Sequence, residues 1–120
     1  MLAMGHKDPV HAAEIAKENL GAKAAEACIM DMGCGSGLCG SELKKLGVGR
    51  EIIGIDASQG MLDQTAKKGV YAELQKIFLG KPEEFPEEHR NRYDAITCTG
   101  MLAEGHLTIT VFDEMLLALK

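Results

Sequence analysis

Three glycines alternate along one short segment of the chain, immediately after an apolar run. Gly33, Gly35 and Gly37 close the sequence Ile-Met-Asp-Met-Gly-Cys-Gly-Ser-Gly, and a helical pattern of apolar residues follows from Cys39. This order predicts a strand, a tight turn and a helix N-terminus, because the turn needs backbone conformations that a β-carbon forbids. Free N–H groups at a helix start favour a negatively charged or hydrogen-bond-accepting group. The segment therefore predicts a site for a nucleotide-type cofactor.

A carboxylate ends the next predicted strand, at a spacing that suits nucleoside binding. The apolar run of residues 51–55 ends in Asp56, which lies 19 residues after Gly37. In a βαβ unit the second strand ends beside the first, so Asp56 would face the same crevice and could accept both ribose hydroxyls. Turn, helix, strand and terminal acid together are much more specific than the glycines alone.

The glycines fit two different cofactor motifs. They can be read as G-x-G-x-G from Gly33, or as the dinucleotide fingerprint G-x-G-x-x-G from Gly35 to Gly40. A dinucleotide motif should begin where the strand ends, at Gly33, and its third small residue would then be Leu38, whose bulk opposes close helix–strand packing. Asp31 suits instead a cofactor with an amino or other cationic group. An NAD(P)-dependent oxidoreductase fragment is kept as the alternative.

Three segments of the chain resemble class I S-adenosylmethionine-dependent methyltransferases. Residues 31–37 resemble the first motif of that family, residues 54–62 the segment that follows it, and residues 93–96 the opening of its fourth strand. The sequence Gly-Met-Leu-Ala-Glu-Gly-His of residues 100–106 is similar to the Williams–Beuren-region methyltransferase-like proteins. The resemblance covers about residues 11–120. It implies an α/β, Rossmann-like three-layer αβα fold with a mostly parallel sheet, S-adenosyl-L-methionine as cofactor, and methyl transfer to an unidentified acceptor.

The resemblance also implies which residues bind the cofactor. The glycine turn would border the methionine portion, with Asp31 near its amino group, and Asp56 would hold the ribose hydroxyls. Ala57 and Met61 would pack on the adenine, and the loop after the fourth strand would line the far side of the crevice. The expected cofactor-binding residues are Asp31, Gly33, Cys34, Gly35, Gly37, Leu38, Asp56, Ala57, Met61, Thr99 and Gly100.

The segment after the third strand departs from the family pattern. Lys81 replaces the acid that approaches the adenine amine in similar proteins, and Pro82 has no N–H to offer the ring. Glu83 is the candidate substitute. His106 is the candidate general base near the crevice mouth, although a lone loop histidine is more often only solvated. Cys34 has no evident base partner, so nucleophilic catalysis is not expected.

Composition limits the class of protein. The chain has 120 residues, 46% of them hydrophobic and 26% charged, and a net charge of −5, which suits one globular domain and argues against a large nucleic-acid-binding surface. It contains no apolar run of membrane-spanning length and no secretory signal at its start. We therefore expect a cytoplasmic protein without a metal centre, whose cysteines are buried reduced thiols. These are Cys28, Cys34, Cys39 and Cys98.

Apolar periodicity and turn residues predict an alternation of strands and helices. This order means a parallel sheet with helices on both faces, a central first strand, and a crevice between the first and fourth strands. The last helix is expected to present Phe112, Met115, Leu116 and Leu119 on one face. Strands are expected over residues 27–32, 51–56, 73–79 and 94–99, helices over residues 9–20, 38–46, 58–69 and 109–119, and a polar, mobile loop over residues 81–92.

Four strands are found where a full methyltransferase domain has seven. We therefore expect residues 1–120 to form a single, incomplete domain. In the family order, the fourth strand would be an open edge, and its residues 95–99 carry no proline or charge to discourage pairing with another chain. Self-association and little or no methyl transfer are then expected. A truncated, non-catalytic module that binds a cofactor or a partner is the other alternative.

Overall fold

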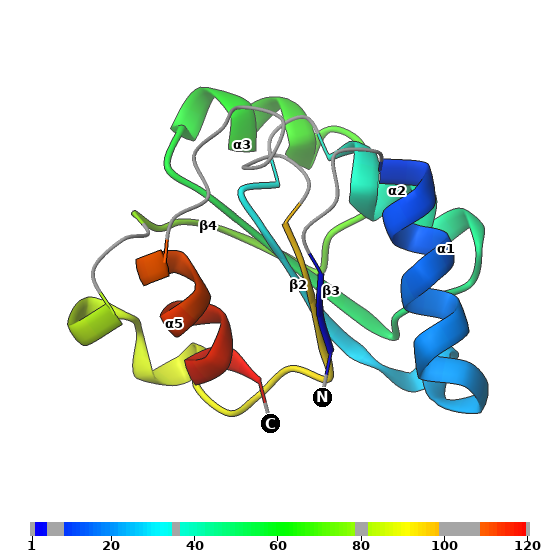
Figure 1. Ribbon diagram of the computed structural model, residues 1–120. Coiled ribbons are helices and arrows are strands. Elements are labelled where there is room, and N and C mark those ends of the chain that lie inside the picture. The colour runs from blue at the N-terminus through cyan, green and yellow to red at the C-terminus, as the bar shows by residue number, and fades with distance from the viewer. Residues whose placement is uncertain (1, 5–8, 35–36, 79–81, 99–108, 120) are drawn as a thin grey trace.

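The protein is an α/β domain whose strands and helices alternate along the chain (Figure 1). The structure is a computed structural model that describes residues 2–4, 9–34, 37–78, 82–98 and 109–119, with only the backbone described for residues 2–4, 9, 82 and 109–112. The strands are β1 (Leu2–Met4), β2 (Cys28–Met32), β3 (Glu51–Asp56), β4 (Glu73–Lys76) and β5 (Ala95–Thr97). The helices are α1 (Pro9–Leu20), α2 (Leu38–Lys45), α3 (Gln59–Ala66) and α5 (Ile109–Ala118), with 3₁₀ helices at Gly21–Glu26, Pro82–Glu84 and Glu87–His89.

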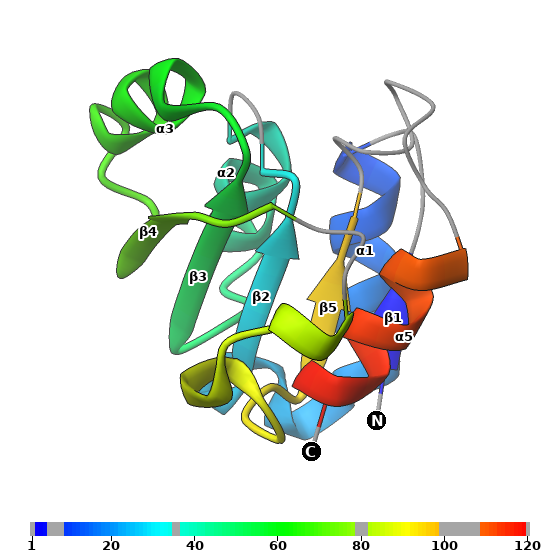
Figure 2. The same ribbon diagram turned by 90° about the vertical axis from the view of Figure 1, so that its left-hand side faces the viewer.

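The strands form one parallel sheet in the order β1-β5-β2-β3-β4. Figure 2 shows them side by side, with α5 in front of the sheet and α1 and α2 behind it. The core toward α1 and α2 consists mainly of alanines and aliphatic side chains, with Tyr71 packed against it, whereas the core toward α5 contains larger side chains such as Tyr93 and Met115. The predicted α/β class, the Rossmann-like layers and the central position of the first predicted strand, β2, are confirmed.

The expectation that the fourth predicted strand, β5, forms an open edge of the sheet is wrong, because β1 pairs with it. Leu2 lies opposite Ala95 and Met4 opposite Thr97 in a parallel ladder. Pairing of this kind uses main-chain N–H and C=O groups, which every residue except proline has, so the short sequence Leu-Ala-Met carried no distinguishing signal. β5 therefore has a neighbouring strand on each side, and self-association through its edge is no longer expected.

Three further expectations about local structure are corrected. The third predicted strand is shorter than residues 73–79 and ends at Lys76. The segment of residues 81–92 is not only a polar loop, since it contains two 3₁₀ helices and the buried side chains of Phe85 and His89. Leu116 is 60% exposed, because the buried stripe of α5 is centred on Met115, Ala118 and Leu119 and turns Leu116 outward.

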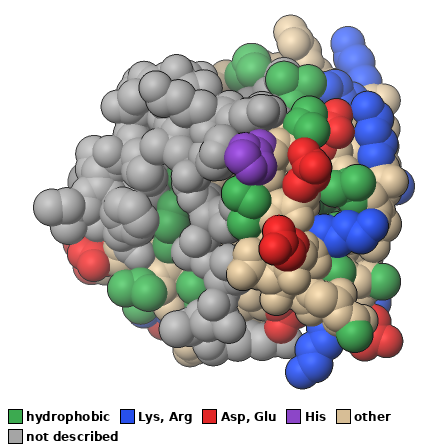
Figure 3. Space-filling model, turned by 45° about the vertical axis from the view of Figure 1, so that its right-hand side comes forward, with side chains coloured by type: hydrophobic (Ala, Val, Ile, Leu, Met, Phe, Trp, Pro, Cys, Tyr) green, Lys and Arg blue, Asp and Glu red, His purple; other side chains and the backbone are tan. Residues whose placement is uncertain are grey.

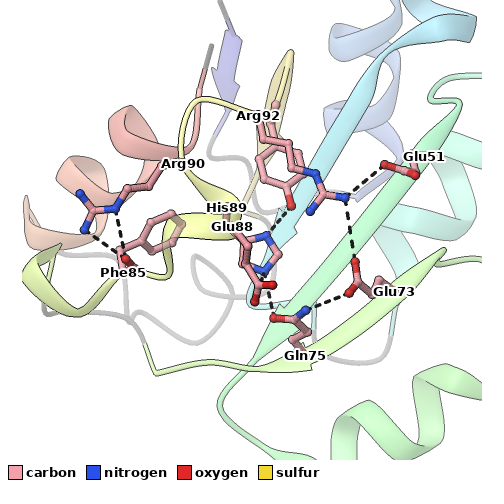
Figure 4. A network of polar contacts seen from close by, with 9 residues as sticks. Glu51, Glu73, Gln75, Phe85, Glu88, His89, Arg90 and Arg92 are labelled. Carbon is pink, nitrogen blue, oxygen red and sulfur yellow. Dashed lines mark hydrogen bonds and ion pairs between the residues drawn. The ribbon is translucent and has the colours of Figure 1, made fainter.

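Buried polar contacts attach this segment to the edge of the sheet (Figure 4). The Nδ1 atom of His89 lies 2.6 Å from the hydroxyl of Tyr93, and its Nε2 atom lies 2.9 Å from Oε1 of Gln75. The Gln75 amide nitrogen donates to Glu73 over 3.0 Å, so its oxygen faces His89. His89 therefore carries its proton on Nε2 and accepts at Nδ1 from Tyr93. Arg92 extends the network, because its guanidinium nitrogen Nη2 lies 3.3 Å from Oε1 of Glu51 and 3.9 Å from Oε2 of Glu73.

The buried position of His89 makes its contribution to stability dependent on pH. Burial lowers the pKa of His89 below its ordinary value of 6.5, and the charge of Arg92 lowers it further, whereas Glu88 acts in the opposite direction. The unfolded chain is then protonated first as the pH falls. Stability from neutral His89 is complete above pH 6.5 and is lost as the pH falls toward the folded-state pKa.

We expect His89→Phe to lower the free energy of unfolding by about 1–3 kcal/mol at neutral pH, because it leaves the Tyr93 hydroxyl and Gln75 oxygen without their buried partner. The difference between wild type and variant should shrink as the pH falls below 6.5. Urea unfolding at several pH values measures it, and a difference that does not change with pH would contradict the buried neutral histidine.

Candidate functional site

The glycine turn joins the carboxyl end of β2 to the start of α2. Gly33 and Gly37 have φ angles of +64° and +82°, in the left-handed region that favours glycine. The N–H of Cys34 donates to the carbonyl of Ile55 over 2.9 Å, and the N–H of Gly37 donates to the carbonyl of Cys34 over 2.9 Å. The described part of the turn is thus attached directly to the end of β3.

Asp56 is the last residue of β3, next to that attachment. Its side chain is half-buried, and its Oδ1 atom accepts a hydrogen bond from the N–H of Ser58 over 2.9 Å. Ser58 in turn caps α3, because its hydroxyl oxygen accepts from the N–H of Met61 over 3.3 Å. Ala57 is exposed and Met61 is half-buried. The structure therefore brings Asp56, Ala57 and Met61 to the same edge of the sheet as the glycine turn.

Asp31 lies in β2, two residues before the turn, and is fully buried. The hydroxyl of Tyr71 donates to its Oδ2 atom over 2.6 Å, and the hydroxyl of Thr97 donates to its Oδ1 atom over 2.9 Å. Burial raises the pKa of Asp31 to about 6, although both hydrogen bonds lower it. The carboxylate is therefore a partner of two protein hydroxyls, a contact that the sequence did not predict.

Tyr71 and Thr97, the two residues that donate to Asp31, were not among the residues expected from the sequence, and Tyr71 is the larger of them. Its ring fills a space left by glycines on two elements, since a Cβ built at Gly40 of α2 would lie 2.5 Å from the ring, and one at Gly54 of β3 would lie 2.9 Å from it. A Cβ at Gly37 would lie 3.3 Å away. Glycine weakens helix and strand interiors, so Gly40 and Gly54 were the available signal that a side chain approaches there.

The contact of Gly40 also changes the argument about the cofactor motif. The expectation that the bulk of Leu38 opposes close helix–strand packing is wrong, because Leu38 is 55% exposed at the first position of α2 and does not lie against the strand. Gly40, the last glycine of the possible dinucleotide fingerprint, faces the ring of Tyr71. Packing against Tyr71 accounts for this glycine, but close packing is also the role of the third glycine in a dinucleotide fingerprint, so Gly40 does not distinguish the two motifs.

The remaining predicted residues divide into two groups. The free cysteines are buried as expected, and burial raises the pKa of Cys34 above its usual range, which argues against a nucleophilic thiolate. Gly35, Thr99, Gly100, Lys81 and His106 lie outside the described residues. Within the described ranges, no group of three or more His, Cys, Asp or Glu side chains could hold a metal ion.

On the face shown in Figure 3, basic, acidic and hydrophobic side chains are interspersed over the described part of the surface. None of the described helices is long and apolar enough to cross a membrane.

Known proteins with similar sequence or structure include several methyltransferases. A family model described as a methyltransferase domain matches residues 29–120. Human Methyltransferase-like protein 27 is 34% identical over 90 residues, which are 74% of this chain and 35% of that protein. An S-adenosyl-L-methionine-dependent methyltransferase from Methanococcus maripaludis has a TM-score of 0.69 at 23% identity, over 93% of this chain and 50% of that chain. For the plantazolicin methyltransferase BpumL, solved in complex with SAH, the TM-score is 0.52 at 18% identity, over 84% of this chain and 41% of that chain.

The chain thus spans about a third of the length of this curated relative. At these identities, the two solved structures show that the fold is shared.

Alanine at position 40 should disturb the packing of the Tyr71 ring, because the new Cβ would lie 2.5 Å from it. We expect Gly40→Ala to lower the free energy of unfolding by about 1–3 kcal/mol. The matched control is Gly60→Ala in α3, where the nearest atom is 3.8 Å away and alanine should be neutral or slightly stabilising. Thermal or urea unfolding of both variants measures this, and equal effects would contradict the described packing.

Proposed function

The chain belongs to the methyltransferase domain family, of the class I S-adenosylmethionine-dependent type, and we propose that its described residues form the cofactor-binding part of such an enzyme. The hydrogen bond from the Cys34 N–H to the Ile55 carbonyl supports this most directly. It holds the glycine turn beside Asp56, so a backbone turn for one end of a ligand and a carboxylate for ribose hydroxyls lie at one edge of the sheet.

The proposed roles follow from the chemistry of each group. Asp56 would accept the two ribose hydroxyls, and Ala57 and Met61 would pack on the adenine. The glycine turn would border the methionine portion, whose amino group would lie toward Asp31. When bound, S-adenosylmethionine supplies a sulfonium methyl group for transfer to an acceptor nucleophile, and the protein aligns the two.

The acceptor is left unassigned. Plantazolicin is the acceptor that the name of BpumL gives for that protein, and the name of the human relative gives none. We propose a cytoplasmic location, supported by four free buried cysteines, which suit a reducing compartment. Two expectations stay predictions. One is that residues 1–120 form a single, incomplete domain, and the other is that the isolated chain shows little or no methyl transfer.

Ligand choice tests the proposal. We expect the purified chain to bind S-adenosylhomocysteine more tightly than NAD, because the glycine turn begins at Gly33, directly after β2, as in the G-x-G-x-G motif. Isothermal titration calorimetry with each ligand measures this. Tighter binding of NAD would overturn the proposed cofactor.

Replacement of Asp56 should weaken binding without unfolding the protein. Two charge-assisted hydrogen bonds to the ribose contribute roughly 1.5–3 kcal/mol each before water compensates, so Asp56→Ala should weaken S-adenosylhomocysteine binding roughly tenfold or more. Asp56→Asn keeps an acceptor for the Ser58 N–H and should show a smaller loss.

The matched control is Asp63→Ala, which removes an exposed carboxylate of α3 that accepts from Gln59 over 2.9 Å. Its affinity should equal that of the wild type, and all three variants should keep the wild-type circular dichroism spectrum. Unchanged affinity in Asp56→Ala would show that Asp56 only ends the strand.

A further inference from the structure

We propose that Tyr71 is a positioning residue of the cofactor site, which fixes the orientation of Asp31 and favours its ionised form. This inference rests on the proposed function, because it is the amino group of the cofactor that would lie toward Asp31. Tyr71 acts through Asp31 in this scheme and is not a catalytic residue. It also connects the segment between α3 and β4 to the end of β2.

The orientation of Asp31 is set by one hydroxyl on each of its oxygens. Tyr71 donates to Oδ2 over 2.6 Å and Thr97 donates to Oδ1 over 2.9 Å. Each hydroxyl has a single proton, and both protons point to the same carboxylate. Rotation of the Asp31 side chain would break one or both bonds in a fully buried place, so the carboxylate plane is fixed.

The hydroxyl of Tyr71 is itself fixed by the backbone around its ring. Gly40 on α2 and Gly54 on β3 leave no room for a Cβ beside the ring, and Gly37, at the N-cap of α2, is the third neighbour. The ring therefore lies beside the last residue of the glycine turn, while the hydroxyl bonds to Asp31. A shift of the turn would move the ring and, through it, the donor to Asp31.

The charges around Asp31 make the Tyr71 hydroxyl important for ionisation. Burial raises the pKa of Asp31, and the charge of Asp56 on β3 raises it further, whereas the hydroxyls of Tyr71 and Thr97 lower it. The charge of Asp31 also acts on the thiols of Cys34 and Cys98, and burial raises the pKa of Cys98 to about 12, so this thiol is neutral. Among these described groups, only the two hydroxyls favour the charged acid.

The first test uses Tyr71→Phe in the ligand-free protein, which keeps the ring but removes the donor. We expect the pKa of Asp31, followed by carbon-13 NMR of its carboxyl group, to rise by about one unit. The matched control is Tyr93→Phe, which removes another buried hydroxyl bond of 2.6 Å on the opposite face of the sheet. Its Asp31 should titrate as in the wild type. An unchanged Asp31 pKa in Tyr71→Phe would overturn the proposal.

The second test measures S-adenosylhomocysteine affinity at two pH values. At about pH 6.5, Tyr71→Phe should bind about threefold more weakly than the wild type, because less of its Asp31 is ionised. At about pH 8.5, Asp31 is ionised in both proteins, so the variant should recover most of the lost affinity and keep only the smaller loss that comes from a less fixed carboxylate. An equal loss at both pH values, or none at either, would overturn the inference in favour of a packing role. A wild type that binds no S-adenosylhomocysteine would refute the proposed function, while the NMR titration would still decide the role of Tyr71.

Discussion

The parallel register of β2 with its two neighbours is the constraint on which the site depends. Asp31 is paired with Gly54 on β3 and with Thr97 on β5. Paired residues of parallel strands project to the same face. The register therefore places the Thr97 hydroxyl on one side of the Asp31 carboxylate and leaves free space at Gly54, which has no side chain, on the other. Tyr71 occupies the space above Gly54. A slip of one residue in either pairing would leave Asp31 and its partner in that pairing on opposite faces of the sheet and separate this group.

Sequence patterns predicted the parts of the site that local rules determine. The glycine turn follows from backbone conformation at Gly33 and Gly37, and the place of Asp56 follows from the rule that parallel strands end at one edge. The bond between Tyr71 and Asp31 joins residues far apart in sequence, and no local pattern encodes it. The pairing of β1 with β5 was missed for a related reason, because three residues of main-chain pairing leave no period to read.

Two buried polar groups on opposite faces of the sheet act on stability in opposite directions. The pKa of Asp31 is raised from 3.8 to about 6, so its contribution is complete at low pH and is lost as the pH rises through about 6. The pKa of His89 is lowered from 6.5, so its contribution is lost as the pH falls. Their slopes oppose each other in the mildly acidic range, and the total stability should change less with pH there than either group alone would cause.

The position of β1 has a consequence for the order in which the sheet forms. Its pairing of Leu2 with Ala95 closes a loop that contains residues 3–94, whereas β2 and β3 are joined by one helix. Closing a long loop costs more conformational entropy, and three residues return few hydrogen bonds for it. The first strand in the sequence is therefore expected to be the last to join the sheet during folding and the first to leave it in native-state fluctuations.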